Sequence, residues 1–241
     1  MPHRIFGFVL VASLFATLSL GQQLSPGSLA QPAVVPSGET QSSPPAESKR
    51  LLGIIPNYRT SPSLLNYGPL TGSEKLKLAS EDAFDRGTVA LAALFAGESQ
   101  LTNANRAFGQ GGAGFGRYWG TAYGDFLIGD YMTEGVFPII LHQDPRYFRR
   151  SIGSKSSRLA YSMGQIFWTH LDSGGTQFNY SEVVGNSVAV AISNAYYVDN
   201  RTATDAVSKL GMQIGVDMAS NILKEFWPDM ERKFRRKGLR K

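Results

Sequence analysis

The sequence predicts an all-α fold, a compact multi-helix bundle whose helices pack through small-residue seams of the glycine-zipper type. Helix-start signals followed by apolar runs recur from about residue 71 onward. Small residues also recur at every fourth position in three segments, a spacing that lines them along one helix face and lets another backbone approach closely. The three predicted packing seams are Gly112, Gly116, Gly120 and Gly124; Gly185, Ala189 and Ser193; and Gly211, Gly215 and Ala219.

The N-terminus has the pattern of a secretory signal peptide. His3 and Arg4 precede an apolar run, and Ser19 and Gly21 are small enough for cleavage after residue 21. An uncleaved membrane anchor is the alternative for residues 1–21. Residues 22–50 are rich in proline and serine and have few large apolar side chains, so we expect a disordered linker. We therefore expect an exported protein, either periplasmic or associated with an envelope membrane.

Residues 51–230 are predicted to form a single helical domain. Three prolines break its first 20 residues, so an extended segment lying over the domain is expected there. Thr71 and Glu74 then fit a capping box, in which the threonine caps a backbone amide and the glutamate reaches back. A helix should run from there to about Gly97, and Gly87 is where it could break.

The central stretch, residues 109–148, predicts a helix from Gly116 onward. Trp119 and Tyr123 fall on the side of the glycines at 100° per residue, whereas Asp125 falls opposite, on the expected solvent or headgroup face. A glycine inside a helix costs about 1 kcal/mol relative to alanine, so the repeat suggests close packing. Pro138 should interrupt this helix.

Three further helices are expected in the second half of the chain. They cover residues 159–170, ending at a turn over 172–175, residues 183–197 after a cap at Asn179, and a segment starting at Thr202. The alternating residues SVAVAI could instead form a strand. Only one such segment is found, so the all-α interpretation is preferred.

Composition and charge limit the possible functions. The chain has 241 residues, no cysteine and a formal net charge of +5, so disulfides, thiolate metal sites and cysteine nucleophiles are excluded. The basic tail, residues 231–241, is interpreted as a solvated helix end or as a segment attracted to an anionic membrane surface. Nucleic acid is not an expected partner of an exported protein. No apolar stretch after the signal peptide is long enough to span a bilayer, so a soluble bundle and helices lying against a membrane both stay open.

Asp130 and Glu134 are the first candidate chemical groups. They lie one helical turn apart, and both are predicted to point inward. Buried carboxyl groups need partners or retain a proton. We expect either an ion-pair network with Arg146, Arg149 and Arg150, or an acid/base or metal-binding pair.

Two His-x-Asp triplets are the second candidate. They contain His142 with Asp144 and His170 with Asp172. Neutral imidazole and carboxylate suit a divalent metal ion or a general base, so these residues with Glu134 could support metal-assisted hydrolysis. Short patterns of this kind also arise by chance. No nucleophile elbow or Walker-type loop is found, and no cofactor other than a divalent metal is expected.

Several strings resemble a family of exported bacterial proteins to which no activity is attached. They are LGIIPNY at 52–58, LTGSEK at 70–75, HQDPRYFRR at 142–150, DSGGTQFNYSE at 172–182, ISNAYY at 192–197 and KEFWPD at 224–229. The resemblance implies one integral domain after the linker.

These observations favour a non-enzymatic, exported helical protein of the cell envelope, with a structural or membrane-interacting role and a possible homo-oligomer through one seam. A small metal-assisted hydrolase is the second hypothesis. A lipid- or peptidoglycan-binding module that uses the aromatic row and the basic tail is the third.

Overall fold

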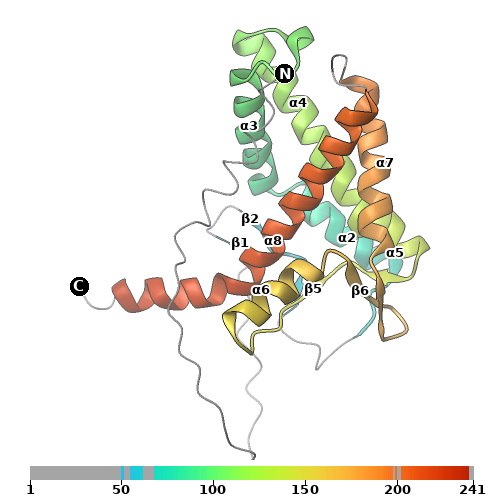
Figure 1. Cartoon of the computed structure of the whole chain (residues 1–241), viewed down its shortest axis with the longest axis vertical. Coiled ribbons are helices and arrows are strands. Elements are labelled where there is room, and N and C mark those ends of the chain that lie inside the picture. Colours follow the sequence, from blue (N-terminus) through green and yellow to red (C-terminus); the bar gives the residue numbers. More distant parts are fainter. Residues whose placement is uncertain (1–49, 52–54, 62–67, 198, 200–201, 239–241) are drawn as a thin grey trace, which may run out of the picture. The chain divides into compact units, whose positions relative to one another are not determined.

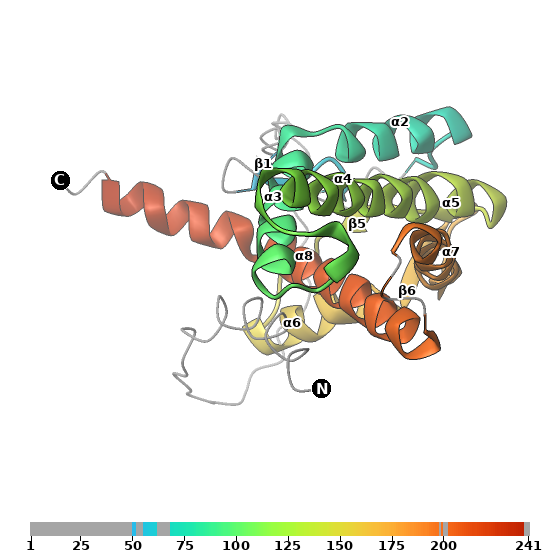
Figure 2. The same ribbon diagram turned by 90° about the horizontal axis from the view of Figure 1, so that it is seen from above.

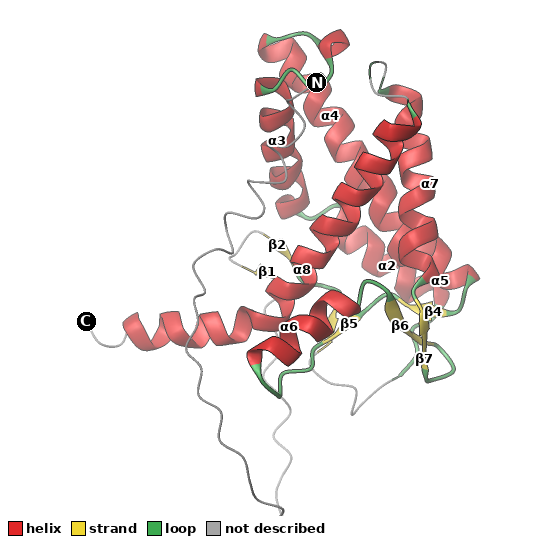
Figure 3. Ribbon diagram, in the orientation of Figure 1, coloured by secondary structure: helices red, strands yellow, loops and turns green. Residues whose placement is uncertain are grey.

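Helices make up most of the chain in the computed structural model, which describes residues 50–51, 55–61, 68–197, 199 and 202–238 (Figures 1 and 3). The prediction of a predominantly helical protein is confirmed. The helical elements are α2 (Gly72–Ala83), α3 (Arg86–Leu101), η1 (Arg106–Phe108), α4 (Gly111–Asp130), the π-helical η2 (Tyr131–Val136), α5 (Phe137–Ile140), α6 (Lys155–Gly164), α7 (Tyr180–Tyr196) and α8 (Ala203–Gly238). The predicted signal peptide and nearly all of the linker lie outside the described residues.

Four of the helices lie side by side in the order α3, α4, α7 and α8. Helix α4 packs against α3 on one side and α7 on the other, and α7 packs against α8. Figures 1 and 2 show this arrangement from two directions. Helix α2 covers η2, and α6 lies against α8. No described helix has both the length and the apolar character needed to cross a membrane.

Side-chain caps begin several of these helices. Thr71 Oγ1 accepts from the Glu74 amide at 3.3 Å while the Glu74 carboxylate accepts from the Thr71 amide at 2.8 Å, which confirms the capping box. Asn179 and Thr202 also accept from backbone amides at the starts of α7 and α8. The predicted break at Gly87 falls slightly earlier, because Asp85 caps α3 by accepting from the Gly87 amide at 2.6 Å.

The all-α prediction needs correction, because short strands join the helices. Strands β4 (Gln143–Asp144), β6 (Trp168–Leu171) and β7 (Thr176–Phe178) form an antiparallel sheet, β3 (Thr60–Ser61) pairs in parallel with β5 (Tyr147–Phe148), and β1 (Arg50–Leu51) pairs with β2 (Ile55–Pro56). The helix predicted over 159–170 therefore ends at Gly164. Gly174 and Gly175, both with positive φ, form the turn that returns the chain from β6 to β7.

Pro138 does not stop the central helix. The chain passes from α4 through the π-helical turn η2 into α5, with the proline in the first turn of α5. Proline has no N–H to offer the carbonyl four residues earlier, which belongs to Glu134. The wider π-helical turn accommodates this missing hydrogen bond, and helix direction is kept.

Two of the three predicted seams lack the close packing that the sequence suggested. Gly112, Gly116 and Gly120 are exposed, and no described atom lies within 4 Å of a Cβ built on any of them. A Cβ on Gly211 or Gly215 would also meet no described atom within 4 Å, although only Gly211 is exposed and Gly215 is partly buried. In the first seam, Gly124 has only the Tyr196 hydroxyl near it, at 3.9 Å, and in the third Ala219 is partly buried.

The side of α4 opposite the glycines is the buried one. Tyr118 is 2% exposed, and its hydroxyl donates to the Asn105 carbonyl at 2.6 Å. Asp125, expected to face solvent or headgroups, instead accepts hydrogen bonds from Tyr196 and Tyr197 of the α7 end. Large side chains bury more apolar area than a glycine stripe, and they therefore determine which side of α4 faces the core.

The seam on α7 does pack closely. A Cβ on Gly185 would lie 2.9 Å from the Thr133 side chain and 3.1 Å from the Met132 main chain. Ala189 and Ser193 follow on the same face and are buried. Here the absence of a side chain lets α7 and η2 approach each other.

Candidate functional site

The structure brings the two His-x-Asp triplets together. Asp144 of β4 lies opposite His170 of the antiparallel strand β6. His142 just precedes β4 and Asp172 just follows β6, and the Asp172 amide donates to the His142 carbonyl at 2.9 Å. From the sequence, we expected these residues to come together by binding the same metal ion. The structure places them side by side through strand pairing instead.

The carboxylates of the triplets already have cationic partners. Asp144 accepts from Arg146 Nε at 2.9 Å and Nη2 at 2.6 Å, and Asp172 accepts from Lys75 Nζ at 2.6 Å. His142 is exposed and has a φ of 53°. Over the described part of the chain, no group of three His, Cys, Asp or Glu residues is arranged to hold a metal ion.

His170 is partly buried beside Phe148, with the ring centroids 4.8 Å apart and edge to face. Burial lowers the pKa of His170 below its ordinary value, and the Asp144 charge opposes this shift. The imidazole therefore favours its neutral form in a structural aromatic contact.

A second group of ionisable residues lies between the helices, and we call it the acid cluster. It consists of the carboxyl groups of Asp82, Asp130, Glu134, Glu182 and Asp217 with the cations of Arg59 and Lys224, which interact electrostatically with one another. These residues come from the β2–β3 connection, α2, α4, η2, α7 and α8. They are separated along the chain and meet only in the fold.

Asp130 and Glu134 both belong to the acid cluster, as their inward orientation predicted. Their partners differ from the expected Arg146, Arg149 and Arg150. The cation nearest to Glu134 is Arg59, whose Nε lies 2.9 Å from Oε1. The same Nε lies 3.6 Å from Asp82 Oδ2.

Two carboxyl pairs stand out within the acid cluster. Asp82 and Glu134 both lie close to Arg59 Nε, and the negative charges of Glu182 and Asp217 repel each other. Burial raises the pKa of Glu134 and of Glu182 well above the ordinary value, although the Arg59 charge opposes both shifts. Burial raises the pKa of Asp130 in the same way, and the Asp82 charge adds to that effect.

A small polar cavity adjoins one edge of the acid cluster. Its volume is about 30 Å³, and its wall includes Arg59, Thr133, Glu182, Asp217 and Asn221. A water molecule needs about 10–15 Å³ measured in this way, so the space suits one or two waters. It is too small for an organic substrate, and the geometry therefore gives no support to a hydrolytic site here.

Glu225 is the centre of a separate, fully satisfied network. Its carboxylate accepts from the Tyr147 hydroxyl at 2.8 Å, the Arg150 and Ser151 amides, and Arg158 Nε at 2.7 Å. It is 0% exposed. Every oxygen of this carboxylate has a donor, so the network fastens β5 and α6 to α8.

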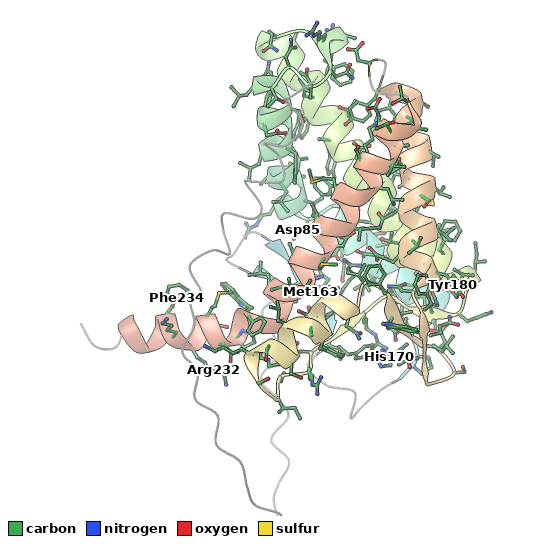
Figure 4. All side chains as sticks on the ribbon, viewed as in Figure 1. Asp85, Met163, His170, Tyr180, Arg232 and Phe234 are labelled. Atoms are coloured by element: carbon green, nitrogen blue, oxygen red, sulfur yellow. The ribbon has the colours of Figure 1, made fainter. Side chains whose placement is uncertain are left out.

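Helix α6 presents apolar residues to solvent, and we call this surface the α6 apolar face. Leu159 and Met163 lie four residues apart, Phe167 follows one turn later, and all are about 40% exposed. Ile152 and Trp168 flank them at 76% and 54% exposure. Figure 4 shows Met163 on this helix.

Comparisons with protein-family models, with curated proteins and with solved structures each find no match to this chain. The resemblance to exported bacterial proteins therefore rests on the short strings alone. In the fold, two of those strings touch, because Tyr147 and Arg149 of HQDPRYFRR contact Glu225 and Lys224 of KEFWPD.

Sequence reasoning missed most of the acid cluster. Glu182 and Asp217 interrupt apolar segments, and this interruption was the only signal that they lie inside. Arg59, Asp82 and Lys224 sit among ordinary polar neighbours. Only the packing of distant segments could reveal them.

Proposed function

We propose that this protein is a non-enzymatic, peripheral membrane-binding protein of the cell envelope, which docks on an anionic lipid surface through the α6 apolar face. The observation that carries the proposal is the orientation of α6. Leu159 and Met163 point to solvent, while Arg158 and Ser162 point inward. The envelope location is supported by the N-terminal pattern of a signal peptide.

The inverted orientation of α6 has a clear cause. Arg158 is 7% exposed and donates to Glu225 and, at 2.6 Å, to Asp229. Its guanidinium also lies 4.6 Å from the centre of the Phe226 ring. Ser162 and Ile166 continue the buried row. With this buried row held against α8, the opposite row must face outward.

The exposed residues suit a bilayer interface. Trp168 packs edge to face on Phe178, which packs edge to face on Tyr180, with ring centroids 6.2 and 5.1 Å apart. Tryptophan and tyrosine favour the headgroup region, where an apolar ring and a polar tip are both satisfied. Leu159 and Met163, which are also exposed, would enter the acyl boundary.

Basic residues support anionic lipid as the partner. Lys155 lies on the same α6 row as Leu159 and Met163, and Arg150 precedes the helix; both are exposed. Arg232 and Lys233 in the final part of α8 are also exposed, and the chain as a whole carries a net charge of +5. Each cation near an anionic membrane contributes about 1 kcal/mol to binding.

Vesicle co-sedimentation of the purified chain after the signal peptide tests the proposal. We expect binding to vesicles of phosphatidylglycerol with phosphatidylethanolamine, and weaker binding to phosphatidylcholine alone. The double variant Leu159→Glu with Met163→Glu should weaken binding about tenfold or more, because a fully buried side chain of this type contributes about 1.5–3 kcal/mol.

The matched control introduces the same charges elsewhere. Leu94→Glu with Val207→Glu alters apolar residues that are 69% and 70% exposed on α3 and at the start of α8. This variant should bind vesicles like the wild type. Equal loss in both variants, or loss of self-association without any vesicle binding, would contradict a lipid-binding α6 face.

A further inference from the structure

We propose that the acid cluster is a proton-binding site. In the folded protein, Asp82 with Glu134 and Glu182 with Asp217 each share one retained proton at neutral pH, and alkaline release of these protons loosens the contacts among α2, η2, α7 and α8. This inference concerns the interior and does not depend on membrane binding.

Both carboxyl groups of the first pair lie near a single cation. Arg59 Nε contacts Glu134 Oε1 and lies near Asp82 Oδ2, which leaves the other oxygen of each carboxyl group. These two atoms, Glu134 Oε2 and Asp82 Oδ1, are buried and receive no hydrogen bond from any described donor. The residues are 1% and 6% exposed. A proton held between the two carboxyl groups would satisfy both oxygens.

The second pair lies beside the polar cavity. Glu182 is 6% exposed and accepts from Asn186 Nδ2 at 2.9 Å through Oε1, and both Glu182 and Asp217 line the cavity. A proton shared between these two carboxyl groups would remove the repulsion between their charges. Water in the adjoining cavity would give this proton a route of exchange.

The charges around the pairs cannot balance five ionised acids. Arg59 and Lys224 are the cations that act on the acid cluster, because Arg146, which also lines the cavity, is paired with Asp144. Full ionisation of the five acids would therefore leave three negative charges uncompensated. Asp85, at the start of α3, adds a further carboxylate near Asp82. Tyr58 donates to Asp85 at 2.9 Å, Tyr123 lies near Asp130, and Tyr147, in the cavity wall, donates to Glu225. Buried charge without compensation is strongly unfavourable, so retained protons are the available solution.

The direction of the pKa shifts agrees with this geometry. Burial raises the pKa of Asp82, Asp130, Glu134 and Glu182 above the ordinary values. The folded chain therefore binds more protons than the unfolded chain above the unfolded carboxyl pKa of about 4. The stability that these groups contribute should be fully present below that pH and be lost as pH rises through the folded values. Lys224, whose pKa burial lowers to about 8, has the opposite tendency.

Denaturant unfolding across about pH 6 to about pH 9 measures the retained protons. Each proton held only by the folded state raises the unfolding equilibrium constant about tenfold per pH unit, so two predict about a hundredfold. Glu134→Gln resembles the protonated acid and should reduce this dependence by about tenfold per pH unit, as should Glu182→Gln. Asp229→Asn is the control, because Asp229 is partly exposed and Arg158 and Arg232 hold its charged form.

Infrared spectroscopy of the folded wild type provides a test that needs no variant to fold. Protonated carboxyl groups give a separate carbonyl band, which should be present at neutral pH and disappear on alkaline titration. Absence of that band, or stability that rises with pH, would overturn the proposal. Stabilisation at alkaline pH by added Mg²⁺ or Ca²⁺ would also overturn it, since it would identify a cation as the occupant.

Discussion

Arg149 donates a hydrogen bond from Nε to the main-chain carbonyl of Lys224, at 3.0 Å. This carbonyl is the one that Pro228, four residues later in α8, cannot satisfy, because proline has no N–H. Figure 1 shows α8 changing direction along its length. The arginine thus supplies from outside the helix the donor that the helix lacks.

Arg149→Met should destabilise the fold by about 1–2 kcal/mol, since a buried carbonyl would lose its donor. In a Pro228→Ala background the new alanine amide can take over, and the cost of Arg149→Met should fall by about 1 kcal/mol. A double-mutant cycle by urea unfolding measures this coupling. Strictly additive effects would show that the two residues act independently.

Gly185→Ala should destabilise the protein by about 1–3 kcal/mol, because its Cβ would overlap the Thr133 side chain and the Met132 backbone. Gly116→Ala is the matched control in another helix. Its Cβ meets no described atom, so helix propensity should make the change stabilising by up to about 1 kcal/mol. Thermal unfolding compares the two. If Gly116→Ala destabilised the protein or dissociated an oligomer, the glycine row on α4 would be a contact surface after all.

Glu225→Ala should cost about 3–5 kcal/mol, because it leaves Arg158 and several other buried donors without their acceptor. Asp229→Ala removes the other carboxylate bound to Arg158, but this side chain is 39% exposed and solvent screens it. Its loss should cost less than about 1 kcal/mol. Chemical denaturation of the two variants measures the difference. Comparable losses in the free energy of unfolding would show that the Arg158–Asp229 pair matters as much as the Glu225 network.

Chelators and zinc test the hydrolase hypothesis directly. Because Asp144 and Asp172 already bind Arg146 and Lys75, we expect no change in melting temperature with either reagent. His142→Asn, which tolerates the positive φ at this position, should change stability by less than about 0.5 kcal/mol. A saturable zinc-dependent rise in melting temperature that His142→Asn abolishes would support a metal site.

The sequence predicted features that depend on near neighbours in the chain. The capping box at Thr71, the cap at Asn179 and the inward side of Glu134 all follow from local spacing. It failed where distant segments compete for one surface. The glycine row predicted the packed side of α4, but Tyr118 on the opposite side is the buried residue. His170, predicted to lie in a helix, instead pairs with β4 as part of β6.

The buried salt bridge of α6 has a consequence for how relatives of this chain can diverge. Arg158 and Glu225 depend on each other for the docking of the helix, whereas Leu159 and Met163 contribute little to that docking. When homologous sequences are aligned, positions 158 and 225 should therefore covary as a pair. Positions 159 and 163 should vary independently of them, and their residue types should depend on the surface that this face contacts in each relative.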